Sequence, residues 1–211
     1  MRISRVHAPV TVLGHRRRVG LWLQGCTIAC PGCASRDTWD ADGGRSVDPR
    51  DVLAVVEELG RDCDGLTVSG GEPLEQAADL ATLLRLLRTS DLALRRSWDV
   101  LLFTGLEADR WNAAQRACAQ LADAVIAGPY RAGEPSQAPL RASANQRLLV
   151  HTDRGRERYG LDEAGDAPHL QVVVDDTGMA MIGLPRPGDL GRMERELRRR
   201  GVHLGEVSWR S

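Results

Sequence analysis

The chain has 211 residues, of which 42% are hydrophobic and 27% are charged, and its formal net charge is −1. This length suits one globular domain with a sizeable core, and the near-neutral charge gives no electrostatic case for binding nucleic acid or an acidic membrane. The sequence contains no lysine, which excludes a lysine Schiff base.

The N-terminal stretch has neither the apolar core nor the small-residue cleavage site of a secretory signal. The chain also has no apolar run of membrane-spanning length. Its five cysteines are therefore expected in a compartment where thiols stay reduced and serve as ligands or catalysts. We expect a cytoplasmic protein that does not bind membranes.

In chain order, apolar runs typical of strands alternate with amphipathic runs typical of helices. The predicted strands lie at residues 18–24, 65–73, 98–105, 123–130 and 145–150. The predicted helices lie at residues 46–60, 74–89 and 106–122. The first helix is the clearest, because Asp48 can cap it, Pro49 sits in its first turn and Gly60 can end it.

The C-terminal part of the chain has a different pattern. Residues 151–168 are polar and are predicted to form a loop. Residues 170–185 are predicted to form a hairpin that turns at Asp176, Thr177 and Gly178. Residues 192–201 predict a charged helix with an exposed face. In the N-terminal part, the arginines at 16–18 indicate either a solvated run or a grip on a phosphate or a partner carboxylate.

The alternation of strands and helices predicts repeated βα units and a parallel sheet. In such sheets, ligands bind at the carboxyl ends of the strands. The conspicuous polar and glycine-containing segments all follow predicted strands: a cysteine-rich loop at 25–33, Ser69 to Glu72, Thr104–Gly105 and Gly128–Pro129. We therefore expect them to form one shared site.

The cysteine-rich loop carries Cys26, Cys30 and Cys33 in the spacing C-x3-C-x2-C. The remaining cysteines, Cys63 and Cys118, are isolated and typical of small buried hydrophobic residues. A structural zinc site needs four protein ligands, and no second C-x-x-C is present. Three thiolates fit an iron–sulfur cluster with one iron left open. The spacing alone leaves a zinc or redox module as an alternative.

A second motif is Ser69-Gly70-Gly71-Glu72-Pro73, at the end of a predicted strand. By itself it indicates a tight turn before a helix, with Pro73 in the first helical turn. Beside the cysteine loop it offers backbone groups that a ligand can approach through the glycines. It also offers a carboxylate suited to an ammonium group.

The two motifs together resemble the signature of the radical S-adenosylmethionine (SAM) superfamily. The closer resemblance is to the glycyl-radical activases, in particular the activating enzymes of anaerobic ribonucleotide reductase. It rests on these segments: 21–40, 67–76, 103–105, 128–130, 145–147 and 182–185. It spans residues 12 to 185. The resemblance implies a single radical SAM domain over residues 1–211, with its core at 12–185, a C-terminal helical extension and the α/β fold of a partial (β/α)6 barrel.

The resemblance also assigns roles to residues. Cys26, Cys30 and Cys33 would hold a [4Fe-4S] cluster whose open iron is chelated by SAM. The methionine ammonium would lie against a strand-end group in which Glu72 is the ionic partner, and the adenine would lie beside the end of the cysteine loop. The implied SAM-binding residues are Gly32, Cys33, Ala34, Ser69, Gly70, Gly71, Glu72 and Thr104.

The implied reaction is reductive cleavage of SAM to methionine and a 5′-deoxyadenosyl radical that abstracts hydrogen, in an activase from a glycine of a partner enzyme. The electron would come from flavodoxin or ferredoxin, because the chain has too few cysteines for a second cluster. Ala127, Ala142 and Ala144 depart from the residues usual in these activases. A radical SAM enzyme that modifies a small molecule or a peptide is therefore the alternative. We expect an open active face, suited to a macromolecular substrate.

Overall fold

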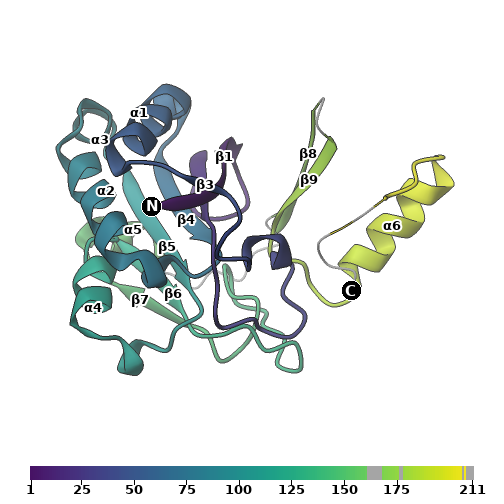
Figure 1. Ribbon diagram of the computed structural model, residues 1–211. Helices are drawn as coiled ribbons and strands as arrows, with labels where there is room; N and C mark the ends of the chain where they lie inside the picture. Colours follow the sequence, from purple (N-terminus) through teal and green to yellow (C-terminus); the bar gives the residue numbers. More distant parts are fainter. Residues whose placement is uncertain (161–167, 176–177, 206, 208–211) are drawn as a thin grey trace.

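The computed structural model describes residues 1–160, 168–175, 178–205 and 207. Seven strands form one sheet in the order β3-β1-β2-β4-β5-β6-β7, and β8 and β9 form a separate hairpin (Figure 1). The sheet strands are β1 Arg2–Val10, β2 Arg18–Leu23, β3 Arg45–Ser46, β4 Gly65–Gly70, β5 Asp99–Thr104, β6 Ala124–Ala127 and β7 Arg147–Val150. The hairpin strands are β8 Leu170–Asp175 and β9 Gly178–Gly183.

Helices cover one face of this sheet, so the fold is a mixed α/β structure. The helices are α1 Pro49–Leu59, α2 Ala77–Thr89, α3 Asp91–Arg96, α4 Ala113–Ala119, α5 Asp153–Tyr159 and α6 Asp189–Arg199. The predicted boundaries of α1 are confirmed, since the Asp48 side chain accepts a hydrogen bond from the Arg50 N–H and Gly60 ends the helix. Within the described part of the chain, no helix has the length and apolar character needed to cross a membrane.

The centre of the sheet is parallel, as the sequence predicts. Strands β2, β4, β5 and β6 run in one direction and are almost fully buried, which explains their continuous apolar runs. Strand β7 departs from this pattern and pairs antiparallel with β6. The physical reason is the connection between them: residues 128–146 form no helix that could carry the chain back across the sheet.

Strands β1 and β3 and helices α3 and α5 were not predicted from the sequence. Strand β1 was not predicted, because its mostly half-buried residues mix arginine and histidine with apolar side chains. The loop predicted at 151–168 was wrong in its first half, where helix α5 forms behind an N-cap at Thr152. Its polar sequence hides the helix, although Thr152 and Gly160 are ordinary start and stop signals. Residues 161–167 lie outside the described residues.

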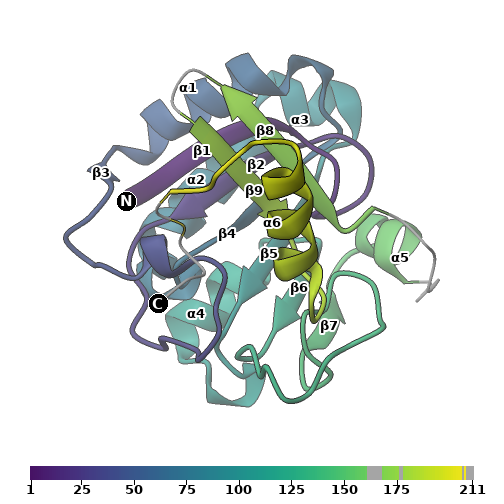
Figure 2. The ribbon, with the colours of Figure 1, turned by 90° about the vertical axis from the view of Figure 1, so that its right-hand side faces the viewer.

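The predicted C-terminal hairpin is confirmed, although Asp176 and Thr177 of its turn lie outside the described residues. The hairpin and α6 lie over the face of the sheet that the other helices leave uncovered (Figure 2). A small hydrophobic cluster joins the hairpin to the sheet, in which Ile182 packs with Trp22 and Leu13 while Phe103 and Val173 border it. The C-terminal unit therefore forms a third layer above the inner face.

A buried ion pair ties the amino ends of the parallel strands together. Arg18 and Asp99 are both fully buried, and the guanidinium donates to both carboxylate oxygens at 2.9 Å. Arg18 also donates to Thr67 Oγ1 at 2.6 Å, so it joins β2, β4 and β5. Burial alone would raise the pKa of Asp99, but the charge of Arg18 and the hydrogen bonds from Arg18 and Tyr159 outweigh it and hold the pKa below 3.8.

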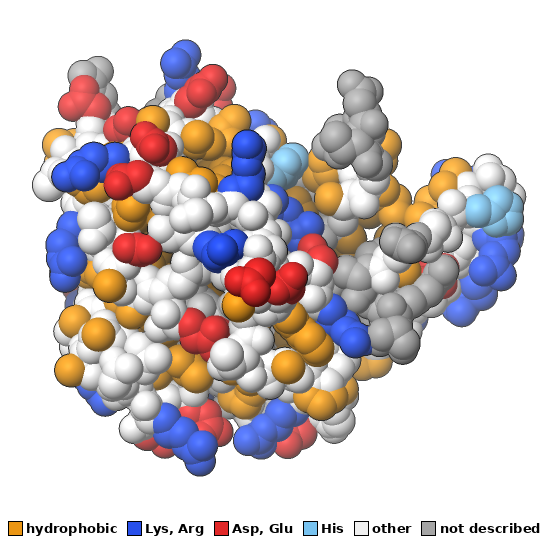
Figure 3. Space-filling model, viewed as in Figure 1, with side chains coloured by type: hydrophobic (Ala, Val, Ile, Leu, Met, Phe, Trp, Pro, Cys, Tyr) orange, Lys and Arg blue, Asp and Glu red, His pale blue; other side chains and the backbone are white. Residues whose placement is uncertain are grey.

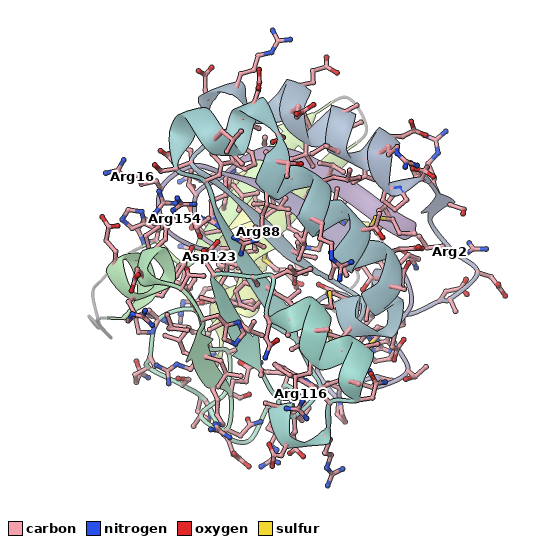
Figure 4. The ribbon with its side chains drawn as sticks, turned by 90° about the vertical axis from the view of Figure 1, so that its left-hand side faces the viewer. Arg2, Arg16, Arg88, Arg116, Asp123 and Arg154 are labelled. Carbon is pink, nitrogen blue, oxygen red and sulfur yellow. The ribbon has the colours of Figure 1, made fainter. Side chains whose placement is uncertain are left out.

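A second buried carboxylate, Asp123, lies directly before β6 and beside α5 (Figure 4). It accepts hydrogen bonds from the Val100 N–H at 2.8 Å and from the Thr152 hydroxyl at 2.5 Å. It thereby links β5 to the N-cap of α5 and to the end of β7. The amino ends of the strands are thus held together by buried charged groups, each of which has an ion-pair or hydrogen-bond partner.

We predict that Asp99→Asn destabilises the protein by about 3–5 kcal/mol, because it leaves the buried Arg18 without its counter-charge. Asp109→Asn is the matched control, since Asp109 has an 80% exposed side chain and its loss should change stability by less than about 0.5 kcal/mol. Urea unfolding of the two variants measures the difference. Equal stability would contradict the role of the pair.

The lowered pKa of Asp99 also predicts a pH dependence. Because the folded state holds the carboxyl below 3.8, its contribution is fully present above that pH and is lost as the pH falls through the folded-state value. The difference in unfolding free energy between wild type and Asp99→Asn should therefore shrink on acidification below about pH 4. A difference that grows on acidification would contradict the assignment.

Candidate functional site

A large cavity lies at the carboxyl ends of β2, β4 and β5. Its volume is about 1040 Å³, and the hairpin, Leu197, residues 202–205 and Val207 form its opposite wall. Every site residue predicted from the sequence lines it: Cys26, Cys30, Gly32, Cys33, Ala34, Ser69, Gly70, Gly71, Glu72 and Thr104. The expectation that the strand-end motifs share one site is therefore correct.

The cysteine loop leaves β2 at Leu23 and closes on itself at its base. The Gly25 N–H donates to the Thr38 carbonyl at 2.8 Å, and the Cys26 N–H donates to the Trp39 carbonyl at 3.1 Å. A tight turn follows, in which the Cys33 N–H donates to the Cys30 carbonyl at 3.1 Å. These bonds hold a short loop of fixed span on the cavity wall.

The three cysteines of this loop are half-buried and form no disulfide. Burial raises the pKa of Cys26 and of Cys30, and backbone hydrogen bonds to each sulfur partly offset this. The Ser35 N–H also points to the Cys33 sulfur at 3.4 Å. Three free thiols with backbone donors on one cavity wall form a donor set that fits an iron–sulfur cluster.

The fit has one limit. Within the described ranges, no group of three His, Cys, Asp or Glu side chains converges closely enough to hold a metal ion. Binding a cluster therefore requires the three sulfurs to draw together. The loop has room for such a movement, because Thr27, Ala29 and Pro31 between the cysteines are exposed.

The glycine turn packs tightly against the base of the cysteine loop. The Glu72 N–H donates to the Gly25 carbonyl at 2.8 Å, and a Cβ atom at Gly71 would lie 2.1 Å from that carbonyl oxygen. At Gly70, φ is +105° and a Cβ would lie 2.4 Å from the Leu23 nitrogen. The glycines thus allow two strand ends to meet. A side chain at Gly71 would therefore meet backbone before it met any ligand.

Glu72 is the buried carboxylate of the cavity, with 1% of its surface exposed. Its Oε1 accepts hydrogen bonds from Thr104 Oγ1 at 2.7 Å and from the Leu74 N–H at 2.9 Å, and its Oε2 accepts one from the Gly105 N–H at 2.7 Å. Burial raises its pKa to about 7, and these three donors oppose the shift. A cationic ligand in the cavity would favour the ionised form.

Several cavity residues were not predicted from the sequence. Trp22 and Phe103 come from the inner face of β2 and β5, and Tyr130 follows β6. Alternation along each strand could have placed Trp22 and Phe103 on one face, but not which face lines a cavity. A backbone hydrogen bond at Tyr130 to the Cys30 sulfur also links the segment after β6 to the cysteine loop.

The active face is less open than the sequence suggested. Apolar side chains of the C-terminal unit line the cavity opposite the cysteine loop, and they are Val173, Met179, Met181, Leu197, Val202, Leu204 and Val207. Figure 3 shows a hollow between this unit and the body of the molecule. The expectation of an open face is wrong, because residues beyond the last sheet strand fold back over it.

Comparison with known proteins identifies the family. Residues 12–149 match a family model described as "4Fe-4S single cluster domain". The anaerobic ribonucleoside-triphosphate reductase-activating protein of Enterobacteria phage T4 is 30% identical over 156 residues, which are 72% of this chain and 96% of that protein. The pyruvate formate-lyase 1-activating enzyme of Escherichia coli (strain K12) is 37% identical over 82 residues, which are 36% of this chain and 33% of that protein.

Among solved structures, QueE from Escherichia coli is similar over 49% of this chain and 52% of its own, with 22% identity and a TM-score of 0.38.

The close approach at Gly71 generates a prediction. Gly71→Ala should destabilise the protein by about 1–3 kcal/mol, because its methyl group has to displace the backbone at Gly25. Gly133→Ala is the matched control, since nothing lies within 4 Å of a Cβ at that position. Thermal unfolding of the protein without ligands measures both. Equal melting temperatures would show that the turn does not depend on this contact.

Proposed function

The chain belongs to the family of 4Fe-4S single cluster domain proteins, and on this premise we propose that it is a radical SAM enzyme that activates a glycyl-radical partner protein. One observation carries the proposal: the three free cysteines and the glycine turn with Glu72 line the same cavity. The phage T4 relative is named as an activating protein of this kind and is matched over nearly its whole length. Membership in a 4Fe-4S family argues against the alternative that the cysteines form a zinc or redox module.

In this proposal, Cys26, Cys30 and Cys33 hold a [4Fe-4S] cluster with one iron left for SAM. When bound, the cluster and SAM supply abstraction of a hydrogen atom from a substrate carbon. The chain itself supplies the ligands, the backbone donors to the sulfurs and a cavity wall with the half-buried Trp39 behind the loop. Arg36 stacks over the Trp39 ring at 5.1 Å, which helps to exclude water from the base of the loop.

The strand ends are proposed to bind the methionine part of SAM. Glu72 is the ionic partner of its ammonium group, and Thr104 keeps the carboxylate in position through its 2.7 Å hydrogen bond. Ser69 and Gly70 offer polar and backbone contacts on the same wall, and Gly71 sets the shape of the turn. Gly32, Cys33 and Ala34 at the end of the cysteine loop are proposed to lie beside the adenine.

The cluster assignment predicts a division among the five cysteines. Cys26→Ala, Cys30→Ala and Cys33→Ala should each lose most cluster iron after anaerobic reconstitution, together with SAM cleavage. Cys63→Ala and Cys118→Ala should retain both, because these thiols are buried in the helical layer. Iron analysis and visible absorbance at about 400 nm measure cluster content. Full iron content in any of the first three variants would refute the ligand set.

The SAM assignment predicts that Glu72→Gln weakens SAM binding while cluster content stays near normal. The loss of one charge-assisted contact lowers affinity by about tenfold to a hundredfold. Glu134→Gln, at a half-exposed position outside the cavity, is the control for removal of one negative charge. Equilibrium binding to the reconstituted protein measures the difference. Unchanged affinity in Glu72→Gln would contradict the role of this carboxylate.

We also propose that residues 1–211 form one radical SAM domain whose core is a partial (β/α)6 barrel. The four parallel strands with helices outside and ligand-binding segments at their carboxyl ends support this fold. The hairpin and α6 are the C-terminal extension of that domain.

A second candidate function is modification of a small molecule or a peptide. It is favoured by the hairpin and α6, which lie beyond the family match at 12–149 and yet line the cavity. Ala142, one of the departures from the usual activase residues, also lines it, whereas Ala127 and Ala144 do not. A cavity wall outside the segment that matches the family model is consistent with a different substrate.

One experiment distinguishes the two functions. The reconstituted protein, SAM and a one-electron donor such as flavodoxin or ferredoxin are incubated anaerobically with a candidate glycyl-radical enzyme. We expect a glycyl doublet in electron paramagnetic resonance and faster formation of 5′-deoxyadenosine when the partner is present. Deuterium transfer from a small molecule or a peptide into 5′-deoxyadenosine, with no protein radical, would instead support the second function.

A further inference from the structure

A second cavity lies at the other end of the inner face, toward the amino ends of the strands. Its volume is about 420 Å³, within the range of small-molecule sites. It is enclosed by the connection between β1 and β2, the loop after β6, helix α5 and the segments flanking the hairpin. It shares Ala142, Leu184 and Pro185 with the first cavity and contains none of the predicted cluster or SAM residues.

The walls of this second cavity are apolar and stiff. Ile126 and Leu148 come from the sheet, and Leu140 packs into the same hydrophobic cluster from the loop after β6. The remaining wall contains many prolines, namely Pro135, Pro139, Pro168, Pro185 and Pro187. Because proline fixes its own φ, these segments lose little further freedom when a ligand binds.

The charged groups on these walls are mostly cationic. Arg141, Arg158 and Arg186 line the cavity together with two histidines, His15 and His169, and they face one carboxylate, Glu157. His169 is paired with Asp189 at 2.7 Å behind the wall. The lining therefore has a formal excess of two positive charges with the histidines neutral.

The floor of the cavity leaves this excess unchanged, because Arg18 behind it is balanced by Asp99. Arg158, with 11% of its side chain exposed, contacts the same Asp99 carboxylate that Arg18 holds, so two guanidinium groups share one counter-charge. Tyr159 also donates to Asp99 at 2.6 Å, and burial raises the pKa of its phenol, which keeps it neutral.

Two further arginines lie at the same edge of the molecule: Arg16, from the connection between β1 and β2, and Arg154, from α5 (Figure 4). Arg16 lies 3.8 Å from the Asp64 carboxylate, so Arg154 is the one that adds positive charge. Burial lowers the pKa of His15, and the charges of Arg158, Arg16 and Arg18 lower it further while Asp99 opposes them. The response of His15 is the one expected beside surplus positive charge.

We propose that this second cavity binds a small organic anion, a carboxylate or phosphate ester with an apolar body. The guanidinium group of Arg186 matches the geometry of carboxylate and phosphate oxygens, and the proline and leucine walls match the apolar part. Arg158 contributes its charge from behind, because its guanidinium donates to Asp99 and to the Asp64 and Ser97 carbonyls. The site is separate from the cluster and SAM cavity, and it stands whether or not the proposed function holds.

The test uses the full-length protein under anaerobic conditions and isothermal titration calorimetry with four probes. The first two, 4-phenylbutyrate and phenyl phosphate, distinguish the two kinds of anion. The third, 4-phenylbutanol, has the apolar body without the charge, and inorganic phosphate has the charge without the body. At least one of the organic anions should bind about tenfold or more tightly than the alcohol and than inorganic phosphate.

Variants then locate the binding. Arg186→Gln should lower the affinity for the organic anion about tenfold, and Ala138→Trp should abolish binding by filling the cavity. Arg110→Gln, which removes an 82% exposed charge outside the cavity, should leave it unchanged. Circular dichroism and thermal unfolding confirm that each variant is folded, and Arg141→Gln replaces Arg186→Gln if that variant is not.

Saturating SAM should leave the affinity for the organic anion unchanged, because the residues that the two cavities share, Ala142, Leu184 and Pro185, are not among those proposed to bind SAM. The proposal is overturned if neither organic anion binds, if the alcohol binds as tightly as the anions, or if the cavity variants bind like wild type. Competition between SAM and the anion would place the probe in the first cavity and would overturn it as well.

Discussion

The close junction of three strand ends is the constraint on which the candidate site depends. Gly71 brings the end of β4 against the Gly25 carbonyl at the end of β2, and the Glu72 carboxylate binds Thr104 and Gly105 at the end of β5. A side chain at Gly71 would push the ends of β4 and β2 apart. A residue at position 72 with a shorter side chain would not reach Thr104 and Gly105 at the end of β5. The cysteine loop starts from this junction, so its position relative to the buried carboxylate is fixed by backbone contacts.

The two ends of the sheet are built from opposite chemistry. At the carboxyl ends, half-buried thiols and one buried carboxylate with a raised pKa face a large cavity. At the amino ends, two arginines share Asp99 and leave surplus positive charge beside a smaller cavity. Gly14 makes the second arrangement possible, because a Cβ there would lie 2.6 Å from the Arg18 side chain. The same inner face thus presents one surface suited to a cationic ligand and another suited to an anion.

The C-terminal unit gives this chain a cavity wall that the family match does not include. Its apolar side chains face the strand ends, whereas Arg199 at the end of α6 and Arg200 directly after it have exposed side chains. A small hydrophobic cluster around Ile182 and Trp22 joins the hairpin to the sheet, and the Gln171 side chain forms hydrogen bonds with Pro9 and Thr11. The shape of the cavity therefore depends on how the hairpin is attached to the sheet.

The sequence by itself determined four parallel strands, the caps of α1 and ten residues that line one cavity, because these follow from local patterns, spacing and the resemblance of the motifs. Apolar runs identify buried strands. The loop with three cysteines follows directly after one of them, so its place at the carboxyl end of that strand is set by the sequence. The tertiary structure alone decided that Arg18 is fully buried while Arg16 and Arg17 beside it are exposed, since its partner Asp99 is 81 positions away. It also decided that Gly71 serves packing and that the hairpin covers the site. Those outcomes depend on contacts between distant segments, which no local pattern encodes.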